Sequence, residues 1–149
     1  MLLMNILFMC VANSARSQMA EGLARKMFAN SAKVESAGSQ PARVNPFAIR
    51  VMQEIGIDIS KHYSKSYDDL TPSFIVSLDY VITLCAEEVC PQMVSRAKKL
   101  HWPLPDPANK EGSEAVQLAR FRETRDALMK RMRDFALEAG IPIADWQAK

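Results

Sequence analysis

Short apolar runs typical of β-strands alternate with segments of helical periodicity along this chain. The strand-like runs are 5–10, 33–37, 80–84 and 99–102, and the helical patterns are 17–29, 46–55 and 112–139. Strands that alternate with helices favour a parallel sheet with right-handed crossovers and helices on both faces. We therefore predict an α/β protein, a flavodoxin-like three-layer sandwich around a four-stranded parallel sheet.

The length and composition of the chain predict one ordinary globular domain, spanning residues 1–149. Hydrophobic residues make up 48% and charged residues 24%, which argues against a disordered or fibrous chain. The net charge is only +2, and the arginines of the last predicted helix are interleaved with acidic residues at ion-pair spacing. We expect no nucleic-acid partner and no membrane partner. We also expect a monomer, because no feature of the sequence requires a larger assembly.

The apolar start of the chain favours a buried strand over a targeting segment, because it has no basic residues before it and no small-residue cleavage site after it. No other run approaches the roughly 18 apolar residues that span a bilayer. The three cysteines are an odd number, which cannot form a closed disulfide framework and is more natural in a reducing compartment. These observations predict a cytoplasmic protein.

The first predicted strand ends in a cysteine, which is followed by five loop residues and then by an arginine and a serine that open a helix. Inward N–H groups of such a loop form an anion nest, which the helix start reinforces. Arg16 would hold two oxyanion oxygens in a bidentate fork, and Ser17 would help to hold Cys10 as a nucleophilic thiolate. We predict an oxyanion-binding loop of Val11, Ala12, Asn13, Ser14, Ala15, Arg16 and Ser17, in which Cys10 and Arg16 are catalytic. The structural alternative is a small buried cysteine beside a surface arginine.

Residues 6–21, Ile-Leu-Phe-Met-Cys-Val-Ala-Asn-Ser-Ala-Arg-Ser-Gln-Met-Ala-Glu, resemble the phosphate-binding loop and first helix of the arsenate reductases related to low-molecular-weight protein tyrosine phosphatases. Further matches at 35–38, 45–46, 84–85, 90–91 and 106–107 extend the resemblance over most of the chain. It implies the low-molecular-weight phosphotyrosine phosphatase fold and a thioredoxin-coupled arsenate reductase.

Two more cysteines fit this resemblance. Reduction of arsenate to arsenite takes two electrons, which two thiols supply when they form a disulfide. The resemblance implies a relay in which Cys85 attacks the adduct of Cys10 with arsenic and Cys90 then takes over the disulfide. It also implies an external thiol reductant, thioredoxin or glutaredoxin, and no tightly bound cofactor. The structural alternative is a buried strand-end residue for Cys85 and a surface residue for Cys90.

The proline-rich loop at 103–107 follows the fourth predicted strand and carries Asp106. The resemblance implies that Asp106 is catalytic and protonates the departing hydroxide. A turn aspartate that bonds its own backbone is the structural alternative. Tyrosine phosphatases usually have an aromatic residue soon after this aspartate, whereas this chain has Ala108, which disfavours a phosphatase.

One branch of the reductase family holds a potassium ion near the loop with asparagine, glutamate, serine and aspartate. Asn13, Glu21 and Ser36 match three of these residues, and Lys65 stands at the fourth position. An ammonium group there would replace the charge of the ion, so we expect little potassium dependence. We predict no metal site, because the two histidines are isolated and the methionines occupy core-like positions.

These features favour an arsenate reductase that acts on arsenate through Cys10 and also accommodates phosphate. A low-molecular-weight protein tyrosine phosphatase, which hydrolyses phosphomonoesters through a Cys10 thiophosphate, is the first alternative. It would need Arg16 and Asp106 but neither of the other two cysteines. A non-catalytic oxyanion-binding module is the second alternative.

Overall fold

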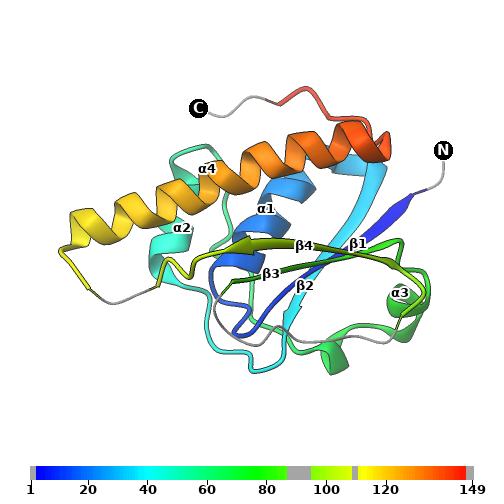
Figure 1. Ribbon diagram of the computed structural model, residues 1–149, viewed down its shortest axis with the longest axis horizontal. Coiled ribbons are helices and arrows are strands. Elements are labelled where there is room, and N and C mark those ends of the chain that lie inside the picture. Colours follow the sequence, from blue (N-terminus) through cyan, green and yellow to red (C-terminus); the bar gives the residue numbers. More distant parts are fainter. Residues whose placement is uncertain (1–2, 87–94, 109–110, 147–149) are drawn as a thin grey trace.

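The structure is a computed structural model, which describes residues 3–86, 95–108 and 111–146. Strands and helices alternate along the chain as the sequence predicts (Figure 1). In chain order, the elements are β1 (Met4–Cys10), α1 (Arg16–Phe28), β2 (Ala32–Gly38), α2 (Pro46–Gln53), α3 (Pro72–Val76), β3 (Tyr80–Cys85), β4 (Lys98–Leu104) and α4 (Glu114–Ala139). Two short 3₁₀ turns are also present, at Ala29–Ser31 and Tyr67–Asp69.

The four strands form one parallel sheet in the order β2-β1-β3-β4, which confirms the predicted flavodoxin-like sheet. β1 is a central strand. Its last residue, Cys10, pairs with Gly38 of β2, and Met9 pairs with Thr83 of β3. Because the strands are parallel, their carboxyl ends and the loops that follow them meet at one edge of the sheet.

Helices cover both faces of the sheet, but unequally. α1, α2 and α4 lie on one face and the short α3 lies on the other (Figure 1). The larger core packs Phe8 of β1 against residues of the three helices, including Leu23 and Phe135. The smaller core packs Leu7 of β1 against Phe74 of α3. Adjacent residues of β1 thus point to opposite faces, as the alternation of side chains along a strand requires.

Several details differ from the sequence prediction. α3 was not predicted, because five residues are too few to show a helical period, although its start carries a capping pattern. The side chain of Thr71 accepts a hydrogen bond from the N–H of Phe74, and Pro72 occupies the first helical turn. β3 continues one residue further than expected, so Cys85 is its last residue and does not lie beyond its end.

β4 is also longer than predicted, because it continues past Trp102 to Leu104. Proline is tolerated there because β4 is an edge strand, where the missing N–H of Pro103 removes no bond to a further strand. The pairing of β3 with β4 is irregular between Thr83 and Cys85. No helix among residues 3–86, 95–108 and 111–146 is long and apolar enough to span a membrane.

Candidate active site

The predicted strand-loop-helix unit is present, because β1 ends at Cys10 and α1 begins at Arg16. Cys10 is a free thiol with only 2% of its surface exposed. Ala15 occupies the N-cap of α1, and none of the side chains that the structure describes caps this helix. The first N–H groups of α1 therefore lack a capping side chain at the place where the helix dipole favours an anion.

The carbonyl groups of the loop point outward and are held there by flanking segments. The carbonyl of Val11 accepts from the N–H of Gln40 (2.9 Å), and the carbonyl of Ala12 accepts from the N–H of Ala42 (3.0 Å). Further along the loop, the carbonyl of Ser14 accepts from the backbone N–H of residue 45 (2.9 Å). Since each peptide plane carries its C=O and the next N–H on opposite sides, the following N–H groups point toward the inside of the loop. This arrangement is compatible with the predicted anion nest, and the binding of an oxyanion there stays a prediction.

Ser17 connects the loop to the sulfur of Cys10. Its hydroxyl lies 2.9 Å from Cys10 Sγ, and its oxygen accepts a hydrogen bond from Asn13 Nδ2 (2.7 Å). Because the asparagine donates to this oxygen, the hydroxyl hydrogen is available to the sulfur. The structure therefore places Ser17 in hydrogen-bond contact with Cys10, and its effect on the reactivity of the sulfur stays a prediction.

Arg16 lies between the loop and the end of β4. Its side chain is 5% exposed and donates from Nη1 to the carbonyl of Leu104 (2.9 Å), while Nη2 lies 4.0 Å from Asp106 Oδ2. The carboxylate of Asp106 is 47% exposed and also accepts from the N–H of Ala108 (2.9 Å). Tertiary structure thus brings two predicted catalytic residues together across 90 positions of sequence. Asp106 has the turn contact of the structural alternative as well, so its catalytic role stays a prediction.

Cys85 ends β3, the strand next to β1, and only 2% of its surface is exposed. Adjacent strands lie about 4.8 Å apart, so the carboxyl ends that carry Cys10 and Cys85 are neighbours. Cys85 is disulfide-bonded, whereas Cys10 is free. Cys90, the third predicted catalytic cysteine, lies outside the described residues.

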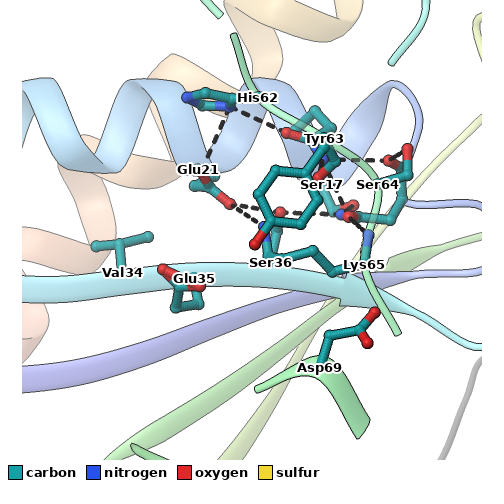
Figure 2. Close-up of polar contacts among 12 residues, drawn as sticks. Ser17, Glu21, Val34, Glu35, Ser36, His62, Tyr63, Ser64, Lys65 and Asp69 are labelled. Carbon is teal, nitrogen blue, oxygen red and sulfur yellow. Dashed lines mark hydrogen bonds and ion pairs between the residues drawn. The ribbon is translucent and has the colours of Figure 1, made fainter. Parts of the chain in front are cut away.

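Charged and polar groups from α1, β2 and residues 62–65 gather in one cluster (Figure 2). At its centre is the carboxylate of Glu21, which accepts a hydrogen bond from the hydroxyl of Ser36 (2.6 Å). Lys65 Nζ lies 3.3 Å from this carboxylate, as do Arg25 Nη2 and His62 Nδ1. Lys65 is 4% exposed, so its charge lies where the resemblance implies a cation.

The surroundings of His62 favour its uncharged form. Burial lowers the pKa of His62 below its ordinary value of 6.5, and the positive charges of Arg25 and Lys65 act in the same direction. Glu21 and Asp58 oppose this shift, because a nearby carboxylate favours the imidazolium.

Several residues of the site were not predicted from sequence. Gly38 packs against the backbone of the loop, Gln18 and Ser64 donate to the carbonyl of Asn13, and His62 contacts Gln18. One sequence signal was available for Gln18, which is a polar residue next to the apolar face of a predicted helix. The other contacts join segments far apart in sequence, and no local pattern indicates them.

The parallel sheet and the loop with its cysteine and arginine define a class, the cysteine-dependent phosphatases and their relatives that bind a tetrahedral oxyanion. The family model of the low molecular weight phosphotyrosine protein phosphatases matches residues 5–141. The chain therefore belongs to this family.

Relatives at about 40% identity are arsenate reductases. The chain is 43% identical to the arsenate reductase of Halalkalibacterium halodurans over 133 residues, which cover 88% of this chain and 94% of that protein. It is 40% identical to the arsenate reductase of Bacillus subtilis, over the same number of residues and with the same coverage of both chains.

Solved structures agree with this relationship. A structure described as an arsenate reductase in the phosphate binding state is 34% identical, has a TM-score of 0.75, and is matched over 93% of this chain and 99% of that one. The thioredoxin-dependent arsenate reductase of Corynebacterium glutamicum is 32% identical with a TM-score of 0.69, over 93% of this chain and 62% of that one. The comparison confirms the predicted fold family.

Proposed function

We propose that this protein is an arsenate reductase that uses Cys10 as its nucleophile. The observation that carries the proposal is a second buried cysteine, Cys85, at the end of the strand beside β1, in a chain about 40% identical to arsenate reductases. A phosphatase of this fold has no use for a second thiol, because hydrolysis transfers no electrons.

The first step is the attack of the Cys10 thiolate on arsenic. The N–H groups of the loop and Arg16 neutralise the negative oxygens, and Asp106 supplies the proton with which the displaced oxygen leaves as water. The product is a covalent adduct in which arsenic, still As(V), is bonded to Cys10 Sγ. The carboxyl of Asp106 is exposed enough to exchange protons with solvent after each turnover.

The second step is the redox step. The Cys85 thiolate attacks Cys10 Sγ, the sulfur-sulfur bond forms, and the electron pair of the sulfur-arsenic bond stays on arsenic, which leaves as arsenite. Two thiols are thereby oxidised to a disulfide and As(V) is reduced to As(III). Cys90 then attacks Cys85 and releases the Cys10 thiolate.

The cycle closes when an external dithiol reduces the remaining disulfide. We propose thioredoxin as this donor, since the relative from Corynebacterium glutamicum is described as thioredoxin-dependent, with glutaredoxin as the alternative. The chain then needs no tightly bound cofactor. Because the donor must itself be kept reduced, we place the protein in the cytoplasm.

The test is arsenite production from arsenate by the purified protein with thioredoxin, thioredoxin reductase and NADPH. Wild type should turn over with thioredoxin, whereas Cys85→Ser should form the Cys10 adduct and release no arsenite. Cys10→Ser is the matched control, because it should lose arsenate reduction and any hydrolysis of an aryl phosphate together. Equal reduction by wild type and Cys85→Ser would refute the relay.

The same preparations separate the rival functions. A tyrosine phosphatase would hydrolyse an aryl phosphate without making arsenite, and Cys85→Ser would leave that hydrolysis unchanged. A binding module would bind phosphate or arsenate and turn over neither compound. Ala108, where phosphatases of this family usually carry an aromatic residue, makes the phosphatase the weaker candidate.

A further inference from the structure

Asn13 lies at the centre of the loop in a conformation that needs external support. Its φ of 48° is in the left-handed region, which costs a residue with a side chain about 1–2 kcal/mol, less for asparagine. Asn13 is completely buried, and its side-chain Nδ2 donates both to Ser17 and to Ser36 (2.9 Å). The position of Asn13 therefore affects both the loop backbone and the residue that contacts Cys10.

One backbone group fixes the direction of the hydrogen bonds around Asn13. The N–H of Lys65 can only donate, and it donates to Asn13 Oδ1 (2.8 Å), so that atom is the amide oxygen. The nearest amide atom of Gln18 faces this Oδ1 (3.0 Å), the carbonyl of Asn13 (3.2 Å) and the carbonyl of Tyr63 (3.0 Å). Three oxygens around one amide atom require that atom to be the nitrogen, Gln18 Nε2.

The same reasoning fixes His62. With Nε2 of Gln18 turned toward Asn13, its Oε1 faces His62 Nδ1 at 3.0 Å. Glu21 Oε2 lies 3.3 Å from the same ring nitrogen. Both neighbours only accept hydrogen bonds, so His62 Nδ1 carries a hydrogen and donates it. Figure 2 shows the ring of His62 beside the carboxylate of Glu21, joined to it by a dashed line.

We propose that Gln18 is a positioning residue of the oxyanion loop, and that His62 orients the Gln18 amide so that both of its hydrogens face Asn13 and its surroundings. Neither side chain is placed to touch the oxyanion; both act through Asn13. The inference deepens the proposed function and rests on it only in treating residues 11–17 as an oxyanion site. It predicts that the affinity of the loop for an oxyanion depends on the orientation of the Gln18 side-chain amide, although this amide does not contact the oxyanion.

Two substitutions of Gln18 distinguish a residue that positions Asn13 from one that only fills space, because the two roles predict opposite orders of phosphate affinity. Gln18→Met keeps an unbranched side chain but removes both hydrogen bonds to Asn13. Gln18→Glu keeps the size and shape but turns a second oxygen toward the oxygens of Asn13. We expect the dissociation constant for inorganic phosphate to rise about tenfold in Gln18→Met, from the loss of two hydrogen bonds, and further in Gln18→Glu. A residue that only fills space would tolerate glutamate best.

His62 offers a matched pair of its own. Asparagine places an amide nitrogen where Nδ1 stands, whereas leucine has the same branching and no donor. We expect His62→Leu to weaken phosphate binding about threefold to fivefold, from the loss of one hydrogen bond, and His62→Asn to bind within about twofold of wild type. Rescue by asparagine would not occur if the histidine mattered only for packing.

The experiment is isothermal titration of the reduced full-length chain with inorganic phosphate, for wild type and the four variants, each checked for cooperative thermal unfolding. Met27→Ala is the control for lost stability, because Met27 is a buried core residue at the far end of α1. It should lower the melting temperature and leave phosphate affinity unchanged. If Gln18→Glu does not fold, Gln18→Met and the His62 pair still decide the question.

The inference is supported by weaker binding in Gln18→Met together with rescue by His62→Asn. It is overturned if Gln18→Met binds phosphate as wild type does, or if His62→Asn and His62→Leu lose affinity equally. Phosphate binding requires no electron transfer. A chain that shows the expected affinities but makes no arsenite would therefore refute the proposed reductase and leave this inference standing.

Discussion

Gly38→Ala tests whether the position of the oxyanion loop depends on a close approach of two backbones. Gly38 ends β2 and pairs with Cys10. A Cβ added to Gly38 would lie 2.4 Å from the carbonyl oxygen of Val11, 2.9 Å from the nitrogen of Asn13 and 2.9 Å from the carbonyl oxygen of Cys10. All three contacts are with backbone atoms, which cannot rotate away as the end of a side chain can.

The geometry sets the size of the effect. Ordinary contact begins at 3.4 Å, so the nearest atom would have to move by about 1 Å. Because a displacement of about 1 Å at a reacting centre costs about 100-fold in rate, we expect a loss of that order in kcat/KM for arsenate. The forced methyl group should also lower the free energy of unfolding by about 1–3 kcal/mol.

Gly140→Ala is the matched control, because Gly140 has a φ of 69° but nothing within 4 Å of its added Cβ. It should lower the free energy of unfolding by about 1 kcal/mol through backbone strain alone, with kcat/KM and phosphate affinity unchanged. The assays are steady-state arsenate reduction, phosphate titration and urea unfolding. If Gly38→Ala keeps kcat/KM and phosphate affinity within about threefold of wild type, the reasoning is refuted.

Three further predictions concern charge. Hydrogen bonds from the guanidinium of Arg122, and then of Arg125, lower the pKa of Glu54 from 4.5 to about 2. The ionised Glu54 carboxylate with its two arginines should therefore stabilise the fold above pH 4.5, and this stabilisation should be lost as the pH falls toward 2. Since the carboxylate is 37% exposed and screened by solvent, Glu54→Gln should lower the unfolding free energy by only about 1 kcal/mol at pH 7. An equal loss for this variant at pH 7 and pH 2.5, measured by urea unfolding, would contradict that assignment. Turnover should respond little to potassium, because the ammonium group of Lys65 already faces a buried carboxylate; potassium-stimulated arsenate reduction at constant ionic strength would contradict this. Arg16→Lys should raise the phosphate dissociation constant at least tenfold, because a lysine cannot form a bidentate fork; an affinity near that of wild type would show that Arg16 contributes charge alone.

Local sequence patterns predicted the framework of the fold and the nucleophile. The apolar run that ends at Cys10 and the helical period after Arg16 each depend on neighbouring residues, so a short window of sequence suffices to recognise them. The order of strands and helices then implied a parallel sheet with helices on both faces. The dependence on local patterns also explains why α3 was not predicted, because its five residues make fewer than two helical turns.

Tertiary structure decided how the loop is held. The carbonyls of the loop are turned outward by residues 40–45, and Lys65 lies beside Glu21 although 44 residues separate them. The orientation of Gln18 depends on His62, which is equally distant in sequence. No periodicity or spacing predicts such contacts, because they arise only when the sheet brings separate segments together. The sequence therefore indicated the cysteine, the loop and the arginine of the candidate site, whereas the packing of distant segments determined the hydrogen-bond directions and charges around the thiol.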